Sequence, residues 1–98
     1  MTVEVKGTHG YSPGESTREY IDKKLKRLQH VDEHIADLHI ILDKETQDQY
    51  NAESNIHFRW GGMGHIKVSD RDLFKAIDAL FDKTVVKINK EKEKMQSH

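Results

Sequence analysis

Two sets of cationic side chains recur at helical spacing in this chain. The later set has the spacing i, i+4, i+7 and i+11, and consists of Lys83, Lys87, Lys90 and Lys94. The earlier set places an aromatic ring among cations at i, i+3, i+4 and i+7, and consists of Tyr20, Lys23, Lys24 and Arg27. Residues at these spacings lie on one side of a helix. Lysine and arginine contact RNA phosphates, and tyrosine can stack on a base. The two stripes therefore predict an RNA-binding surface, and we expect them to meet over a groove between two helices.

Charge segregation supports this interpretation, although the total charge is close to zero. The chain has 16 Lys and Arg, 17 Asp and Glu, and 7 His, which gives a formal net charge of −1. A nucleic-acid-binding protein is often strongly basic, but local fields matter more than the total. Residues 83–94 contain five lysines against Glu91 and Glu93, a local charge of +3. The alternative is that these lysines only solvate the helix and favour its C-terminal dipole.

No motif in the chain nominates an enzyme. Cysteine is absent, which excludes disulfides, thiolate metal ligands and cysteine nucleophiles, and suits a reducing compartment. The chain also lacks a dinucleotide-binding glycine motif, a P-loop and a nucleophile elbow. Asp78 and Asp82 are predicted on a solvated helix face, without the apolar surroundings that a general acid needs. We therefore expect no catalytic residue and no cofactor.

The histidines raise the question of a metal site. Three of them, His39, His57 and His65, are expected on the exposed face of a sheet. Two more, His30 and His34, are four residues apart near a helix end. Neither set has the carboxylate partner and open-site spacing of a zinc motif. The sequence therefore predicts solvated strand histidines and no metal.

Two segments have the 3.6-residue period of amphipathic helices. Ser12, Pro13 and Glu15 indicate a capping box that starts the first helix, which is predicted to reach about Leu28. Its buried stripe is predicted to be Thr17, Ile21, Leu25 and Leu28. The second helix is predicted from Asp72 to about Lys94. Its buried stripe is predicted to be Leu73, Ile77, Leu80, Thr84 and Ile88.

Four segments alternate apolar and polar residues, which is typical of half-buried strands. The first is short and contains Val3 and Val5. The second spans residues 37–43, with Leu38, Ile40 and Leu42 on one face. The third has the clearest alternation and spans residues 52–60. A glycine-rich hairpin loop at residues 61–64 leads to the fourth, which contains Ile66 and Val68.

The predicted order is β-α-β-β-β-α, an α+β fold in a single domain spanning residues 1–98. Because each strand has one apolar face, both helices should pack on the same face of a four-stranded mixed sheet. The strand-helix-strand start predicts that the first two strands are parallel if they are adjacent. Residues 95–98 are expected to fray. Neither a signal peptide nor an apolar stretch of membrane-spanning length is recognisable, so we expect a cytoplasmic protein without membrane contact.

Three segments resemble a known family. The most specific is residues 72–83, DLFKAIDALFDK, which is similar to a signature D-[ML]-[YF]-x-A-I-[DN]-x-L-x-[DN]-K and is followed by basic residues in 87–90, KINK. Residues 39–45, HIILDKE, and residues 18–21, REYI, are similar as well. Together with the element order, they resemble the ribosome hibernation promoting factors, also called protein Y or ribosome-associated inhibitor A. The resemblance covers nearly the whole chain and is looser before residue 18.

The resemblance implies a protein that binds the small ribosomal subunit in the channel where mRNA and tRNA would lie, and silences translation in stressed cells. It implies ribosomal RNA contacts at the positions that match the family pattern, which are Lys24, Arg27, Lys83, Lys87 and Lys90. A short-form member such as this one is expected to be monomeric off the ribosome and to act with or against a second hibernation factor. The chain departs from the family pattern at Val86 and Glu91.

Two other interpretations remain open at this point. A double-stranded RNA-binding module shares the α-β-β-β-α order and also reads phosphates. A protein-interaction domain would carry the same lysines only as solvated faces. Preference for free duplex RNA over assembled subunits would indicate the first, and binding to no RNA at all would indicate the second.

Overall fold

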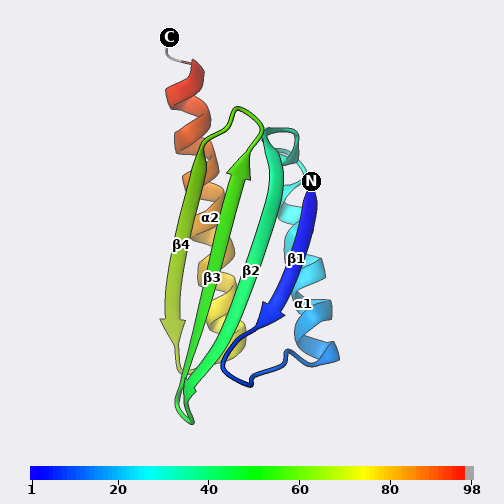
Figure 1. Cartoon of the computed structure of the whole chain (residues 1–98), viewed down its shortest axis with the longest axis vertical. Coiled ribbons are helices and arrows are strands. Elements are labelled where there is room, and N and C mark those ends of the chain that lie inside the picture. Colours follow the sequence, from blue (N-terminus) through cyan, green and yellow to red (C-terminus); the bar gives the residue numbers. More distant parts are fainter. Residues whose placement is uncertain (97–98) are drawn as a thin grey trace.

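Four strands make one mixed sheet in the computed structural model, which describes residues 1–96. They are β1 (Thr2–Gly7), β2 (Ile35–Thr46), β3 (Gln49–Phe58) and β4 (Met63–Asp70). The strands lie in the order β1-β2-β3-β4, with β1 parallel to β2 and the other neighbours antiparallel (Figure 1). The predicted four-stranded mixed sheet and its parallel first pair are therefore confirmed.

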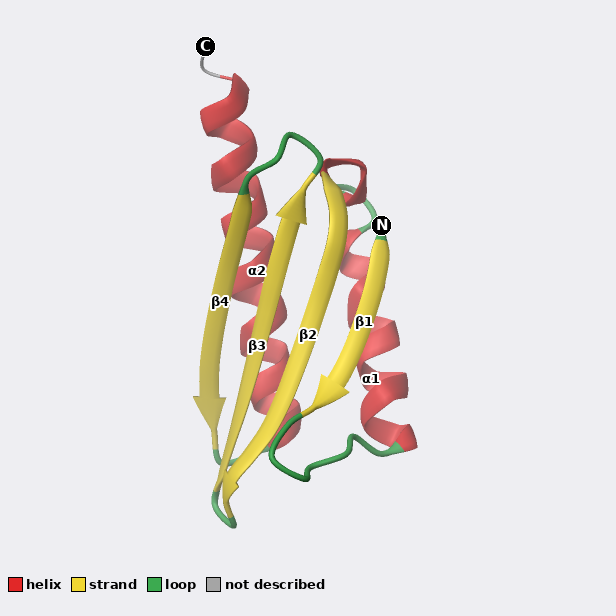
Figure 2. Ribbon diagram, in the orientation of Figure 1, coloured by secondary structure: helices red, strands yellow, loops and turns green. Residues whose placement is uncertain are grey.

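Two helices cover the same face of this sheet, as predicted (Figure 2). α1 spans Glu15–Leu25 and tightens into a 3-10 turn at Lys26–Leu28 before a second 3-10 turn at Asp32–His34. α2 spans Leu73–Gln96, and its C-terminal end extends past the β3–β4 hairpin (Figure 1). Residues 97–98, which belong to the end predicted to fray, lie outside the described part of the chain.

The predicted capping box at the start of α1 is wrong. α1 begins at Glu15, and its N-cap is Gly14, which has extended backbone and no side-chain cap. The chain must first fold back closely against the end of β1. A Cβ on Gly7 would lie only 1.9 Å from the carbonyl oxygen of Tyr11 and 2.9 Å from the Pro13 ring. Pro13 is therefore buried in this loop, and the helix starts only after it.

The predicted inward faces form the core between sheet and helices. Leu38, Ile40 and Leu42 of β2 are fully buried. Ile21 of α1 and Leu28 of the 3-10 turn that follows α1 are fully buried as well. From α2, the fully buried apolar side chains are Ile77, Leu80, Ile88 and two that the predicted stripe omitted, Ala76 and Phe81. The period-2 and period-3.6 patterns therefore identified most of the core.

One hydroxyl pair crosses the core between β3 and α2. The hydroxyl of Thr84 donates to the carbonyl oxygen of Leu80 at 2.7 Å, and lies 2.9 Å from the hydroxyl of Ser54. Because the Thr84 proton is used within α2, Ser54 is the donor between the two side chains. Both residues are only 1% exposed. This bond fixes the position of α2 along β3.

The start of α2 is capped by an aspartate. The Oδ1 atom of Asp72 accepts hydrogen bonds from the backbone N–H groups of Phe74 at 2.9 Å and Lys75 at 3.4 Å. These are two of the donors that the first turn of a helix leaves unpaired. The cap therefore defines where α2 begins, and with it the position of every side chain along the helix.

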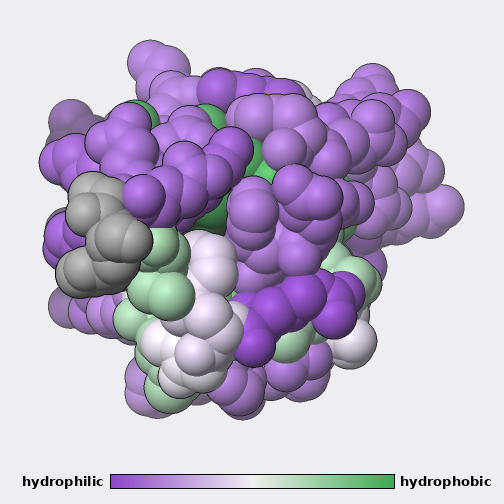
Figure 3. Space-filling model, turned by 90° about the horizontal axis from the view of Figure 1, so that it is seen from above, coloured by the Kyte–Doolittle hydropathy of each residue, from purple (hydrophilic) through white to green (hydrophobic). Residues whose placement is uncertain are grey.

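The folded chain is elongated, with extents of 47 × 20 × 20 Å. Seen along its length from the end at which α2 terminates, its surface is dominated by hydrophilic residues (Figure 3). Within residues 1–96, no helix is both long enough and apolar enough to cross a membrane.

Candidate RNA-binding surface

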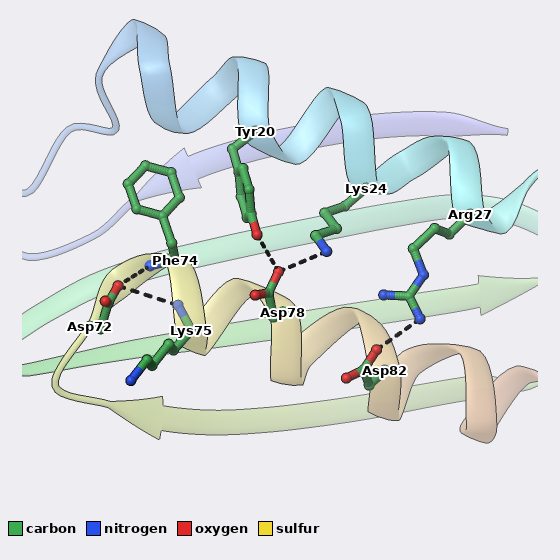
Figure 4. Close-up of polar contacts among 8 residues, drawn as sticks. All are labelled: Tyr20, Lys24, Arg27, Asp72, Phe74, Lys75, Asp78 and Asp82. Atoms are coloured by element: carbon green, nitrogen blue, oxygen red, sulfur yellow. Dashed lines mark hydrogen bonds and ion pairs between the residues drawn. The ribbon is translucent and has the colours of Figure 1, made fainter.

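Three side chains of the earlier basic stripe point toward α2, namely Tyr20 and Lys24 of α1 and Arg27 of the 3-10 turn that follows it (Figure 4). The Tyr20 hydroxyl donates to Oδ1 of Asp78 at 2.5 Å, and the Lys24 ammonium lies 2.8 Å from the same oxygen. One turn further on, the Arg27 guanidinium lies 2.8 Å from Oδ1 of Asp82. We call these five residues the interhelical ladder. It connects the exposed flanks of the two helices above the core.

The ladder overturns two expectations. The basic stripes of α1 and α2 do not meet over a common groove, because the side of α2 that faces α1 carries Asp78 and Asp82. These two carboxylates are also not on a purely solvated face, since Asp78 pairs with Lys24 of α1 and Asp82 pairs with Arg27 of the 3-10 turn after α1. If the lysines of α2 faced the cations of the earlier stripe, the like charges would repel. The orientation of α2 about its own axis instead places Asp78 and Asp82 opposite those cations.

The contacts among Tyr20, Lys24 and Asp78 shift the pKa values of all three groups. Hydrogen bonds from Lys24 and then from Tyr20 lower the pKa of Asp78 below its usual value. The Asp78 carboxylate raises the pKa of Lys24. It also raises the pKa of Tyr20, because it accepts a hydrogen bond from the Tyr20 hydroxyl. The Tyr20 ring also packs edge-on against Phe74, with centroids 4.7 Å apart. Tyr20 is thus held by α2 and does not present a free hydroxyl or a free ring to an RNA base.

The later basic stripe lies on the opposite flank of α2. Its members, which we call the lysine stripe, are Lys83, Lys87, Lys90 and Lys94. The aliphatic stem of Lys87 lies over β4, because a Cβ added to Gly64 would be 3.4 Å from its Cε atom. The stripe therefore runs along the outer edge of the sheet, away from α1.

Ion pairing divides the lysine stripe into two kinds of cation. The ammonium of Lys87 lies 3.1 Å from Glu91, and that of Lys94 lies 3.4 Å from the same carboxylate. These contacts, with Lys87 first, lower the pKa of Glu91. By contrast, the exposed Lys83 and Lys90 form no ion pair within residues 1–96. They are the members most available to an anionic partner.

A shallow apolar groove of about 340 Å³ runs beside the lysine stripe. It is lined by Ile66, Asp82, Lys83, Val86, Lys87 and Lys90. Val86 is 52% exposed, a high value for a valine in the middle of a folded helix. The sequence placed Val86 beside the basic residues but gave no sign that β4 would supply the other wall.

The remaining candidate of the earlier stripe, Lys23, is exposed, and so is Lys26, which the predicted set omitted. Neither forms an ion pair within residues 1–96. Their i, i+3 spacing was visible in the sequence, but Lys26 falls in the 3-10 turn after α1. The outer surface of α1 therefore offers unpaired cations beside the ladder.

The open face of the sheet carries the three strand histidines, as predicted. Each has a carboxylate from a neighbouring strand nearby: His39 lies 3.9 Å from Glu4, His57 3.6 Å from Asp37, and His65 3.0 Å from Glu53. Asp37, His39 and His57 line one shallow pocket, and His65 is not part of that lining. Within the described residues, no three His, Cys, Asp or Glu side chains are placed to hold a metal ion.

Comparisons with known proteins give a consistent result. The family model described as sigma 54 modulation protein / S30EA ribosomal protein matches residues 3–96. The ribosome hibernation promoting factor of Klebsiella oxytoca is 29% identical over 98 residues, covering 100% of both chains. That of Pseudomonas putida KT2440 is 31% identical over 97 residues, covering 99% of this chain and 92% of the relative.

Solved structures agree. A ribosomal subunit interface protein from Coxiella burnetii superposes with a TM-score of 0.84 at 25% identity, over 95% of this chain and 99% of the other. The N-terminal domain of Thermus thermophilus protein Y has the same fold, with a TM-score of 0.73 at 23% identity, over 92% of this chain and 98% of the other. The chain therefore belongs to the sigma 54 modulation protein / S30EA ribosomal protein family, and the predicted resemblance to the ribosome hibernation promoting factors is confirmed.

Proposed function

We propose that this protein is a non-enzymatic, cytoplasmic ribosome hibernation factor that occupies the mRNA and tRNA channel of the small ribosomal subunit in stressed cells. Family membership supports ribosome association, since relatives are named ribosome hibernation promoting factors and a structural neighbour is named a ribosomal subunit interface protein. The observation that carries the RNA-binding part is the lysine stripe, in which Lys83 and Lys90 form no ion pair within residues 1–96, on a protein of near-zero net charge. The protein acts as a monomer off the ribosome, and a second hibernation factor is its candidate partner.

The predicted RNA-binding residues have two different roles in this proposal. Lys83, Lys87, Lys90 and Lys94 contact ribosomal RNA phosphates directly, together with Lys23 on the outer surface of α1. Tyr20, Lys24 and Arg27 mainly hold the two helices together, because their polar groups already bind Asp78 and Asp82. The Arg27 side chain is still 44% exposed, so it can reach a phosphate in addition to its partner.

Inhibition follows from occupancy and needs no chemical step. The molecule is a rod 47 Å long and 20 Å across. Its helices are fixed to the sheet by the buried core and to each other by the ladder, so little conformational freedom is lost on binding. Phosphate neutralisation supplies the affinity. A rigid rod held in the channel excludes mRNA and tRNA sterically.

Co-sedimentation with purified small subunits tests this function. The double variant Lys87→Glu/Lys90→Glu should lose binding, because it turns two cations of the lysine stripe into anions. The matched control is Lys6→Glu/Lys67→Glu, which makes the same charge change at exposed positions of β1 and β4. It should bind like the wild type. Circular dichroism of both variants checks that they fold.

A competition arm separates the ribosome factor from a general duplex-RNA-binding module. Excess free duplex RNA should leave the protein on the small subunit. Displacement by the duplex would favour the double-stranded RNA-binding alternative. Wild-type binding by the Lys87→Glu/Lys90→Glu variant would show that the lysine stripe is not the contact surface.

A further inference from the structure

The outer edge of β4 has no strand partner within residues 1–96. β4 is the last strand of the sheet and pairs only with β3. Its outward backbone N–H and C=O groups are therefore open to a further strand. The other edge of the sheet differs, because β1 is short and the Arg18 guanidinium donates to the Val5 carbonyl there at 3.5 Å. β1 also pairs with one strand only, so the feature that distinguishes the β4 edge is the apolar groove beside it.

The apolar groove lies between α2 and this edge strand, which contributes Ile66 to its lining. Its floor and walls combine Ile66 of β4, Val86 of α2 and the stem of Lys87. Beside the groove, the Lys87 stem packs on Gly64 of β4, where an added Cβ would contact both that stem and Ile56. A groove between a helix and an unpaired edge strand is the geometry at which peptides add to a sheet and insert alternate side chains.

The charges around the groove favour an acidic occupant, because three lysines line it against one carboxylate, that of Asp82, which is already paired with Arg27. Lys83 and Lys90 stand at its two ends and form no ion pair within residues 1–96. With a helical rise of about 1.5 Å per residue, they are about 10 Å apart along α2. Alternate side chains of an extended strand are about 6.7 Å apart, so residues i and i+4 are about 13 Å apart. Two flexible glutamate side chains at that separation can reach both lysines.

We propose that the groove between α2 and β4 binds an extended acidic segment of a partner protein, which adds to β4 as a fifth strand. The residues that face α2 follow the pattern Glu-x-Leu-x-Glu. The leucine enters the groove over Ile66 and Val86, and the two glutamates pair with Lys83 and Lys90. The backbone of the segment takes up the free hydrogen-bonding groups of β4.

A peptide fits these observations better than an unpaired RNA base. The groove contains no aromatic ring on which a base could stack, and stacking supplies much of the affinity of single-stranded RNA sites. An RNA ligand would also leave the backbone of the β4 edge unused. The inference goes beyond the proposed ribosome function and does not depend on it, because its test uses only the free protein and a synthetic peptide.

The test is fluorescence anisotropy with a labelled peptide, acetyl-Thr-Glu-Thr-Leu-Thr-Glu-Thr-amide, followed by amide hydrogen exchange of the complex. The wild type should bind the peptide, and exchange should slow at β4 but not at β1. Val86→Glu should weaken binding at least about tenfold, because it removes an apolar wall and repels the glutamates. The matched control is Met63→Glu, which changes a 73% exposed apolar residue of β4 outside the groove. It should bind like the wild type.

Two control peptides isolate the parts of the proposal. Replacing both glutamates by lysine, or methylating alternate backbone nitrogens on the pairing side, should each abolish binding. The proposal is overturned by a wild type that does not bind the first peptide, by equal binding to Val86→Glu, or by binding without slower exchange in β4. It is also overturned if hexauridylate binds in a Val86-dependent manner while the peptide does not, since the groove would then be a nucleotide site.

Discussion

Replacing Lys83 and Lys90 by glutamine should reduce the salt dependence of small-subunit binding more than replacing Lys24 and Arg27 by glutamine. Both double variants lose two positive charges. The first pair forms no ion pair within residues 1–96, whereas each cation of the second pair lies 2.8 Å from an aspartate. A cation that is already paired within the protein releases fewer RNA counterions on binding, because its charge is largely compensated beforehand.

The size of the effect follows from counterion release. Each phosphate neutralised contributes about 0.7 to 0.9 to the slope of log affinity against log salt. Losing the two unpaired lysines should therefore flatten the slope by about 1.4 to 1.8. Between about 50 and 200 mM salt, the wild type should lose about 7- to 12-fold more affinity than this variant. The variant of Lys24 and Arg27 should change the slope by less than half as much.

The assay is anisotropy of a labelled protein titrated with small subunits at several salt concentrations. Thermal melts of both variants control for folding, since Lys24→Gln/Arg27→Gln also removes two contacts of the ladder. Equal slope changes for the two variants, or a larger change for the variant of Lys24 and Arg27, would falsify the division between the lysine stripe and the ladder.

Three further predictions concern stability and can be checked by urea unfolding. Asp78→Asn should lower the free energy of unfolding by under about 1 kcal/mol at neutral pH, because the Asp78 carboxylate is partly exposed. Since its pKa is lowered in the folded state, this contribution should be lost on acidification, as the pH falls through that lowered pKa. An unchanged difference between wild type and variant in strong acid would contradict the ion pair. Gly7→Ala should cost about 1–3 kcal/mol or more, because its Cβ would overlap the backbone of Tyr11; wild-type stability would exclude that close approach. Thr84→Val should cost about 1–3 kcal/mol by leaving the Ser54 hydroxyl buried without an acceptor. Adding Ser54→Ala should recover part of that loss, and strictly additive losses would argue against the bond.

The fold was largely predictable from local patterns. Leu38, Ile40 and Leu42 alternate along β2, and Ile77, Leu80 and Ile88 repeat at helical spacing along α2; all six are buried. Periodicity predicts such faces because a strand or helix has one apolar side to cover. The start of α1 was not predictable in this way. The capping box at Ser12 is a local signal, and it was overridden by the close packing of the loop against β1.

The helical spacing of the charged residues determined only part of the candidate site. Spacing alone established that Lys83, Lys87 and Lys90 share one flank of α2 and that Asp78 and Asp82 share another. It did not establish which flank faces α1, because the period of a helix gives angles about its own axis and not the direction of its neighbour. Only the packing of both helices on the sheet decided that the aspartates face Lys24 and Arg27 and that the lysine stripe lies over β4. The positions of the cations along each helix were therefore predictable from the sequence, and the tertiary structure decided which of them pair with aspartates.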